Sequence, residues 1–305
     1  APRQGETPTT LLQAPVATAV PIALGCDHLC TYCIVRLRRG ALQSRPMTEI
    51  AAEAAALVGQ GVREITLLGQ NVDAYGQDRT DAASLHALLR AIHPLEGLWR
   101  IRFLTSHPAD LEDELIEAVA ALPKVCPHFE LPVQSGSDAV LRRMVRRYRV
   151  ADYRRLAQRI RQRVPGASIA TDVIVGFPGE TAEQFAETAA LLEELRFDAV
   201  HVAAYSPRPG TAAFRLPDDV PPEEKERRRQ AVEEIQERVV GEINQALLGQ
   251  TVEVLVEGRR KGRWWGRTVT NKLVFFPDDR PRYGDRVAVR VEWAGPWSML
   301  GQPVD

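Results

Sequence analysis

The sequence predicts an α/β protein in which an open (partial) six-unit (β/α) barrel is followed by a small all-β barrel. As far as about residue 220, short apolar runs alternate with helical patterns, which is typical of βα units and a parallel sheet. Six units are too few for the closed eightfold barrel, so one side stays open. From residue 249 on, short β-rich runs are separated by Gly, Pro and Asp, a pattern that favours a small β-barrel.

We expect four segments along the 305 residues, a length that fits one large domain and one small one. Residues 1–18, rich in Pro, Thr and Gln, form an extended lead-in. Residues 19–220 form the open barrel. A charged linker helix over residues 221–248 opens with Pro221-Pro222, and residues 249–305 form the all-β domain.

The elements of the barrel follow from apolar runs bounded by turn residues and from helical spacing of apolar side chains. The expected strands are Val20–Leu24, Glu64–Leu68, Arg100–Leu104, His128–Val133, Ser168–Val175 and Ala199–Tyr205. The expected helices are Thr48–Gly61, Ser84–Ile92, Leu111–Leu122, Ala139–Met144, Ala151–Val164 and Thr181–Leu195. The expected strands of the tail are Thr251–Glu257, Arg267–Val269, Leu273–Phe276 and Arg286–Trp293.

Three of the four cysteines, Cys26, Cys30 and Cys33, fall within the stretch GCDHLCTYC, directly after the first expected strand. Thiolates this close on one loop can converge on a single metal centre, and iron–sulfur clusters are held by such runs. A [4Fe-4S] cubane on three sulfurs leaves one iron for a ligand that is not protein. S-adenosyl-L-methionine can fill that position and be cleaved to a 5′-deoxyadenosyl radical.

A structural zinc loop is the alternative interpretation of the cysteines. Zinc sites usually have four ligands in two C-x2-C pairs. His28 could complete the set, but it lies inside the loop between two cysteines. The pattern therefore favours the cluster. The fourth cysteine, Cys126, is expected to pack as a small, half-buried side chain.

Bulk properties exclude some classes of protein. No run approaches the roughly 18 apolar residues of a membrane span, and residues 1–13 lack the apolar core of a signal peptide. Clustered, unpaired cysteines suit a reducing cytoplasm. The net charge is −1, but from residue 249 on ten Lys and Arg face seven Asp and Glu, so the tail is about +3.

Six motifs in one order carry a resemblance to a known family: GCDHLCTYC, SRP at residues 44–46, LLGQNVDAYG at 67–76, LPVQSGSD at 131–138, TDVIVGFPGET at 171–181 and YSPRPGT at 205–211. Together they resemble the radical-SAM methylthiotransferases from about Val20 to the end. GQTVEVLVEG and GRTVTNKLVFF are similar to the TRAM domain, a small RNA-binding β-barrel. GQN and GRT-x-x-NK resemble most the branch that makes 2-methylthio-isopentenyladenosine beside the anticodon of tRNA. The branches that act on threonylcarbamoyl-adenosine or a ribosomal protein are similar but less close.

The resemblance implies roles for particular residues. Cys26, Cys30 and Cys33 match the cluster ligands, with the aromatic Tyr32 before the last of them, and no other catalytic residue is assigned. The expected contacts of S-adenosylmethionine lie at strand ends: Gly69, Gln70 and Asn71 at its methionine amino end, and Gln134, Ser135, Gly176 and Phe177 around its ribose and adenine.

The tail interleaves basic residues with two indoles, a mixture that can follow phosphates and stack unpaired bases, each base contributing roughly 1–3 kcal/mol. A solvated β-hairpin with one Trp in the core is the simpler alternative. Trp264 and Trp265 should face opposite ways on a strand. The expected tRNA contacts, to the anticodon loop, are Arg259, Arg260, Lys261, Arg263, Trp265, Arg267, Asn271 and Lys272.

Two departures from the family pattern stand out. Relatives carry a preceding domain with three further cysteines for a second [4Fe-4S] cluster, which we expect only in longer members, and no cysteine precedes Cys26 here. Arg36 stands where the family commonly has proline. We therefore expect the radical-generating and RNA-binding portion of a methylthiotransferase, a cytoplasmic monomer served by an external electron donor.

Two rival hypotheses stay open. One is a radical-SAM enzyme that acts on RNA or ribosomal protein without inserting sulfur, for which the absence of a second cysteine set would be natural. The other is a non-catalytic RNA-binding protein, which the tail alone would support, although it leaves the three thiolates unexplained.

Overall fold

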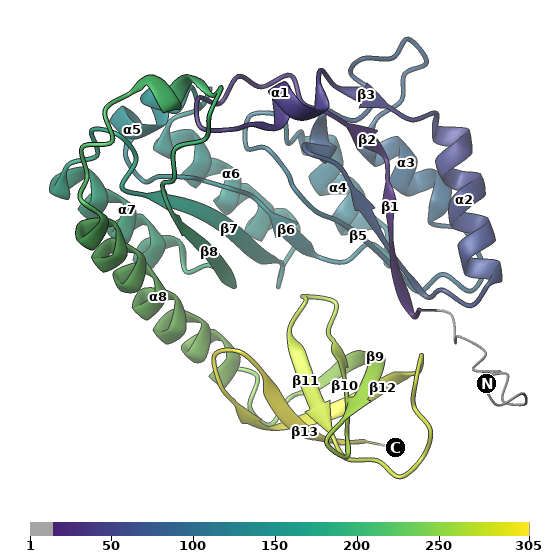
Figure 1. Cartoon of the computed structure of the whole chain (residues 1–305). Coiled ribbons are helices and arrows are strands. Elements are labelled where there is room, and N and C mark those ends of the chain that lie inside the picture. The colour runs from purple at the N-terminus through teal and green to yellow at the C-terminus, as the bar shows by residue number, and fades with distance from the viewer. Residues whose placement is uncertain (1–14, 305) are drawn as a thin grey trace, which may run out of the picture.

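The computed structural model describes residues 15–304, and its larger part is a wall of six parallel strands with helices on the outer face (Figure 1). One sheet has the order β1 (Ala17–Pro21), β4 (Glu64–Leu68), β5 (Arg100–Phe103). The other has the order β6 (His128–Glu130), β7 (Ser168–Val175), β8 (Ala199–Ala204). A bridge between Ile101 and Val125 joins the two sheets.

Within the described residues, β1 and β8 are the free edges of this wall, because neither pairs with the other. The expected open barrel of six βα units is confirmed. The strand ladders are parallel throughout, so the carboxyl ends of all six strands lie at one end of the barrel and the amino ends at the other.

Five helices cover the outside: α2 (Met47–Gly59), α3 (Leu85–Ile92), α4 (Asp113–Ala121), α6 (Val150–Arg163) and α7 (Ala182–Leu195). Shorter turns lie at the carboxyl end: α1 (Val35–Arg39), α5 (Asp138–Arg143), η1 (Val72–Ala74) and η2 (Ala212–Arg215). Local sequence explains the starts of several. Thr181 and Gln184, for example, form a capping box at the start of α7.

The first expected strand differs from the observed one. The strand expected over Val20–Leu24 is two strands, β1 and β2 (Ala23–Leu24), and β2 pairs antiparallel with β3 (Gln43–Ser44). Pro21 lies at the break, where its ring removes a backbone N–H from the ladder. β1 also begins at Ala17, inside the expected lead-in, because Ala17 and Thr18 pair with β4. The rest of the lead-in, residues 1–14, lies outside the described residues.

The smaller domain is a closed barrel of five strands in the order β10–β11–β13–β12–β9, as expected. The strands are β9 (Thr251–Arg260), β10 (Arg263–Arg267), β11 (Leu273–Phe276), β12 (Arg286–Ala294) and β13 (Met299–Pro303). β13 was not predicted from the sequence. β10 begins earlier in the chain than the strand expected over Arg267–Val269, since Thr268 and Asn271 form the turn that follows it. Gly301 makes β13 possible, because a Cβ there would meet the Arg290 carbonyl at 2.2 Å.

A long helix, α8 (Pro222–Gln245), runs along α7 and β8 from the barrel to the small domain (Figure 1). It lies within the segment 221–248 that the sequence predicts as a linker helix. We keep the division at residues 18, 220 and 248 as a proposal. None of the helices in residues 15–304 is long and apolar enough to cross a membrane.

The small domain covers the amino ends of the barrel strands, and two buried arginines of β5 hold it there. Arg102 donates to Glu64 on β4 at 2.8 Å and to the carbonyls of Thr268 and Val269 at 2.7 and 2.9 Å. Arg100, 2% exposed, donates to the carbonyl of Arg267 at 2.6 Å. Buried cations need such partners, so these bonds tie the end of β10 and the turn between β10 and β11 to the base of the barrel.

Candidate active site at the carboxyl ends of the barrel strands

The cysteine loop runs from β2 to α1 across the carboxyl end of the barrel. It starts at Gly25, whose φ of +80° and whose distance of 2.0 Å from a built Cβ to the Ala41 carbonyl leave room only for glycine. The Gly25 N–H donates to Gln70 Oε1 at 2.6 Å. The N–H of Thr31 donates to the Met144 carbonyl at 3.1 Å. The loop is therefore fixed from both sides.

All three loop cysteines line one pocket of about 290 Å³. Of the other predicted cofactor contacts, the structure brings five to the same pocket: Tyr32, Gly69, Gln70, Asn71 and Gln134. The pocket also contains residues that the sequence analysis did not select: His28, Val35, Thr105, Ser106, His107, Pro132, Arg146 and Asp172. The three sulfurs and the ends of β4, β5 and β6 thus share one cavity with Asp172 of β7.

Three predicted contacts do not line this pocket. Ser135 is buried, and its hydroxyl lies 3.2 Å from that of Thr188. The Gly176 N–H donates to Glu180 at 2.6 Å. Phe177 is buried with its ring edge-to-face on Tyr205, 5.2 Å between centroids. Each supports the strand end beside the pocket, and their contact with ribose and adenine stays a prediction.

The pocket holds two buried polar atoms that have no partner within residues 15–304. Asn71 donates through Nδ2 to Asp110 at 2.5 Å, but its Oδ1 accepts nothing. His107 Nδ1 accepts from the Ala109 N–H at 3.2 Å, so Nε2 carries the proton of the neutral ring, and it too has no partner. Such atoms are rare in native proteins. One acceptor and one donor are therefore available to a ligand.

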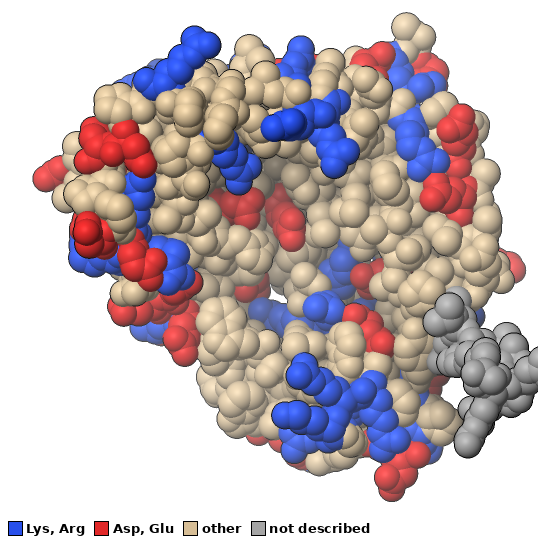
Figure 2. Space-filling model, viewed as in Figure 1, with Lys and Arg blue, Asp and Glu red and all other residues tan. Residues whose placement is uncertain are grey.

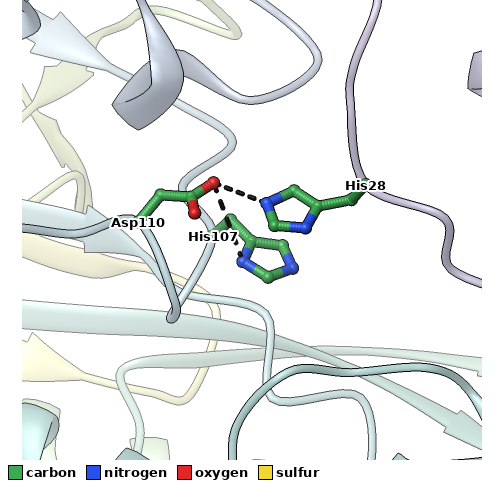
Figure 3. Close-up of side chains that lie close together, drawn as sticks. All are labelled: His28, His107 and Asp110. Carbon is green, nitrogen blue, oxygen red and sulfur yellow. Dashed lines mark hydrogen bonds and ion pairs between the residues drawn. The ribbon is translucent and has the colours of Figure 1, made fainter. Parts of the chain in front are cut away.

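Two stacked histidines and a carboxylate fix the cysteine loop to the end of β5 (Figure 3). The rings of His28 and His107 stack with centroids 3.6 Å apart, and His28 Nε2 donates to Asp110 Oδ2 at 2.5 Å. The ligand atoms of all three residues lie within 4.8 Å of one another. Because His28 is committed to Asp110, this geometry argues against its use as the fourth ligand of a zinc loop.

Protonation in this group follows from burial and hydrogen bonding. Burial lowers the pKa of His107 to about 2, so the ring is neutral. Burial alone would raise the pKa of Asp110, but the hydrogen bonds from His28 and Asn71 hold it below its ordinary value. The carboxylate is therefore charged and can anchor both donors. This group was not predicted from the sequence, although the stretch Thr105-Ser106-His107 follows a strand as the selected motifs do.

Arg146 brings a buried positive charge to the cysteines. Its Nη1 lies 3.5 Å from Cys30 Sγ and 3.4 Å from the Tyr32 hydroxyl, and its Nη2 donates to the Pro132 carbonyl at 2.8 Å. The preceding residue, Val145, has φ of +57°, which is strained for a β-branched residue. A guanidinium so placed favours negative charge on the sulfur. The sequence gives no local signal for this role.

The donor set fits an iron–sulfur cluster. Burial raises the pKa of the Cys26 and Cys33 thiols, but a coordinating metal ion deprotonates a thiol outright. Three free thiols on one loop, a nearby guanidinium and an open cavity are what a cubane with one exchangeable position needs. Cys126 plays no part, since it is 2% exposed beside β5 and burial raises its pKa to about 12. The expectation that it is only half-buried was wrong.

The predicted RNA contacts divide between two places. Arg259, Arg260, Lys261 and Arg263 are exposed on the β9–β10 hairpin, and the last three line a groove of about 590 Å³ with Phe275 and Trp293. Figure 2 shows a cluster of basic side chains on this domain. Trp264 packs in the core, and the ring of Trp265 lies outside it against Gly258.

The other three face the large domain. Arg267 pairs with Glu257 at 2.8 Å, Lys272 pairs with Asp198 at 2.8 Å, and both line a groove at the base of the barrel together with Asn271.

Comparison with known proteins first identifies the class of protein to which the chain belongs. Residues 20–192 match the radical SAM superfamily. The fold is similar to coproporphyrinogen III oxidase from Escherichia coli, with a TM-score of 0.56 and 16% identity over 92% of this chain and 67% of that one. It is also similar to the radical S-adenosylmethionine methyltransferase TsrM from Kitasatospora setae, with a TM-score of 0.52 and 18% identity over 62% of this chain and 37% of that one. The chain is a radical-SAM protein, a class defined by a [4Fe-4S] cluster and S-adenosylmethionine.

The particular family follows from the second domain and from close relatives. Residues 245–304 match the TRAM domain. A tRNA-2-methylthio-N(6)-dimethylallyladenosine synthase from Dehalococcoides mccartyi is 49% identical over 99% of this chain and 73% of that protein. A protein of the same name from Roseiflexus sp. is 51% identical over 94% of this chain and 61% of that protein. The chain belongs to the radical-SAM tRNA methylthiotransferases.

Proposed function

We propose that this chain generates the radical and binds the RNA in an enzyme that adds a methylthio group to isopentenyl-adenosine (dimethylallyladenosine) beside the anticodon of tRNA. One observation carries the proposal. The three free thiols of the cysteine loop and residues from three further strand ends line a single pocket at the carboxyl end of the barrel, where barrels of this type gather their chemistry.

The chain's own residues have separable tasks at that pocket. Cys26, Cys30 and Cys33 would hold a [4Fe-4S] cluster, and Arg146 would offset its negative charge. Asn71 Oδ1, buried and without a partner in the described structure, suits an ammonium donor such as the methionine end of the cofactor. The bound cluster and S-adenosylmethionine supply the electron and the 5′-deoxyadenosyl radical.

The hydrogen bonds around Asp110 keep the cysteine loop in place. Asp73, half-buried, accepts from the Ser106 hydroxyl at 3.0 Å and from the His107 N–H at 2.9 Å. It thereby fixes the loop after β5 that carries His107, whose ring stacks on His28. These polar contacts hold the three thiols over the cavity, and none of residues 26–33 is fully buried.

The source of sulfur lies outside this set of residues. The sequence has four cysteines, and Cys126 is buried beside β5, away from the loop. These 305 residues thus offer ligands for one cubane, and we propose that a second, sulfur-donating cluster is held by other residues. We also keep as proposals an external electron donor, a monomeric state and a place in the cytoplasm.

RNA binding is assigned to the small domain. The exposed basic hairpin of β9 and β10 lines a groove with two aromatic side chains, which suits a phosphate backbone with unstacked bases. We propose that this groove holds the anticodon stem-loop.

Iron analysis and product analysis test the proposal together. After anaerobic reconstitution we expect about four irons per chain, the content of one cubane. With reductant, S-adenosylmethionine and tRNA carrying isopentenyl-adenosine, we expect 5′-deoxyadenosine without net sulfur insertion. Adding a protein domain that carries a second cluster should restore the methylthio product, detected by mass analysis of the nucleosides. Repeated methylthiolation by this chain alone would show that the sulfur has another origin.

A further inference from the structure

A second groove, of about 330 Å³, lies at the opposite end of the barrel from the cysteines. Its walls come from the first residues of β6 and β8, from α8, and from two turns of the small domain. Figure 2 shows the molecule hollowed between its two domains. A groove of this size is large enough for a small ligand.

Three buried polar side chains line this groove, and each keeps an atom without a partner in residues 15–304. The atoms are His128 Nε2, Gln236 Oε1 and Asn244 Oδ1. The three residues are only 3–4% exposed. They come from the barrel and from α8. Buried polar atoms are nearly always hydrogen-bonded, so three buried atoms without a partner on one groove indicate a ligand.

All three of these atoms are acceptors. The amide oxygens of Gln236 and Asn244 can only accept, and Asn244 Nδ2 already donates to the carbonyls of Gly295 and Pro296 at 2.8 and 3.1 Å. The Ser168 hydroxyl donates to the Thr270 carbonyl at 3.1 Å. It therefore accepts from His128 Nδ1, 2.7 Å away, which leaves Nε2 of the neutral ring as a lone-pair acceptor.

The surroundings select against a cationic ligand. Lys272 and Arg267 line the groove, and each is already paired with a carboxylate, Asp198 or Glu257, at 2.8 Å. Asp198 also accepts from the Ile169 N–H at 3.1 Å, so the described residues of the groove offer a cation no unpaired carboxylate. Trp297, 62% exposed, offers a flat face at the mouth. A neutral, flat group rich in N–H donors suits all of these features.

We propose that this groove binds one unpaired nucleotide of the RNA substrate, with guanine as the preferred base. Guanine has three N–H bonds on its Watson–Crick edge, whereas adenine and cytosine have two and uracil has one. Gln236 and Asn244 are eight residues apart on α8, about 12 Å along the axis, so the ligand is longer than one base edge. A ribose hydroxyl gives the remaining donor, and Trp297 stacks on the base.

This inference rests on the proposed function in that RNA is the substrate, but its test needs neither cluster nor cofactor. Four trinucleotides, UGU, UAU, UCU and UUU, are titrated into the full chain and the dissociation constants compared. We expect UGU to bind at least 5-fold more tightly than the others. Gln236→Met, which keeps the volume and removes the acceptor, should weaken UGU about 3- to 10-fold, and Trp297→Ala about 10-fold.

Phe214→Ala is the matched control, because Phe214 is an exposed aromatic side chain on η2 (48%) that lines neither groove. It should leave the preference for UGU unchanged. Gln236→Met should also be at least as heat-stable as the parent chain, since it removes an unsatisfied buried oxygen, so weaker binding by this variant would not reflect unfolding.

Equal affinity for the four trinucleotides would overturn the proposal, and so would a UGU preference that survives both Gln236→Met and Trp297→Ala. Spermidine that competes with UGU in the parent chain but not in Gln236→Met would show a polyamine site and overturn it too. If the preference depends on Gln236 while no methylthio product forms with a second cluster supplied, the groove stands and the proposed function fails.

Discussion

The two ends of the barrel use buried polar side chains in opposite ways. At the carboxyl end, Asn71 and His107 each keep a buried atom without a partner beside the cysteines. At the amino end, Glu64 and the two arginines of β5 bond to one another and to backbone carbonyls of the small domain. The atoms beside the cysteines are therefore left for a ligand, whereas the network of Glu64 and the two arginines, beside the second groove, joins two domains.

The same six strands therefore hold the candidate cofactor site at one end and a stabilising polar network at the other. The cysteine loop at the carboxyl ends is held by short polar contacts and none of its residues 26–33 is buried in the core, so it can carry a cofactor. At the amino ends, Glu64, Arg100 and Arg102 form a buried network of ion pairs and hydrogen bonds. Removing one member would leave another as an unpaired charge in a low-dielectric interior. Substitutions should therefore affect activity at one end and stability at the other.

The largest effect should follow from a change at the carboxyl end. Cys30→Ala should abolish formation of 5′-deoxyadenosine, because a cubane needs all three thiolates of the loop. The unfolding midpoint should hardly move, since the Cys30 side chain is not part of the core. Cofactor cleavage and thermal unfolding are measured on the same preparation.

Cys126→Ala is its matched control at the amino end. It should keep the iron content and the cleavage rate, while the buried thiol is replaced by a smaller side chain at a modest cost in stability. Cleavage at the parent rate by Cys30→Ala would remove the basis for the cluster assignment.

The next largest effect should come from Arg102→Leu at the amino end. Removing one partner of a buried ion pair typically destabilises by about 3–5 kcal/mol, and here Glu64 would stay buried without Arg102. Denaturant unfolding should show a lower midpoint for the barrel. Arg259→Leu on the exposed hairpin is the control and should change stability by less than about 0.5 kcal/mol. Equal effects of the two substitutions would contradict the idea of a structural amino end.

A pH effect of intermediate size should come from His128 at the amino end. Burial lowers its pKa to about 3, below the ordinary value of 6.5. The unfolded chain then takes up the proton first, so this residue's contribution is fully present above pH 6.5 and is lost as the pH falls. Between pH 6.5 and 5 the loss is about 2 kcal/mol. His128→Asn keeps a donor for Ser168 and should flatten the stability profile there. An unchanged profile would show that the ring is already charged in the folded chain.

The smallest effect per residue should be on tRNA binding. Replacing the run Arg259–Lys261 with Ser removes up to three cations that can neutralise phosphates. Each cation removed from the backbone lowers the slope of log affinity against log salt by roughly 0.7–0.9, so the slope should flatten by about 2–3. Fluorescence anisotropy at several salt concentrations measures it. A triple Ser replacement of Arg154, Arg155 and Arg159 on α6 is the control, and a similar change there would place the RNA footprint on the barrel wall.

Local sequence determined much of this protein. Five of the six strands, the five covering helices and the three-cysteine loop were predicted, because each depends on spacing within about ten residues, whereas the first strand was placed three residues too late. The turn chemistry around Gly25 and the capping box of α7 are local in the same way. The β13 strand was missed, since its pairing with β11 and β12 depends on Gly301 rather than on a hydrophobic pattern.

Tertiary structure alone decided which polar groups meet. His28 reaches Asp110 across 82 residues, and Arg146 reaches Cys30 across 116. Lys272, predicted to contact RNA from its motif, pairs with Asp198, 74 residues away. Such partners are set by which loops the parallel strands bring to one end, and burial then fixes their hydrogen bonds and charges. The sequence shows which residues are able to form such contacts. Which of them meet is decided only when the whole barrel has folded.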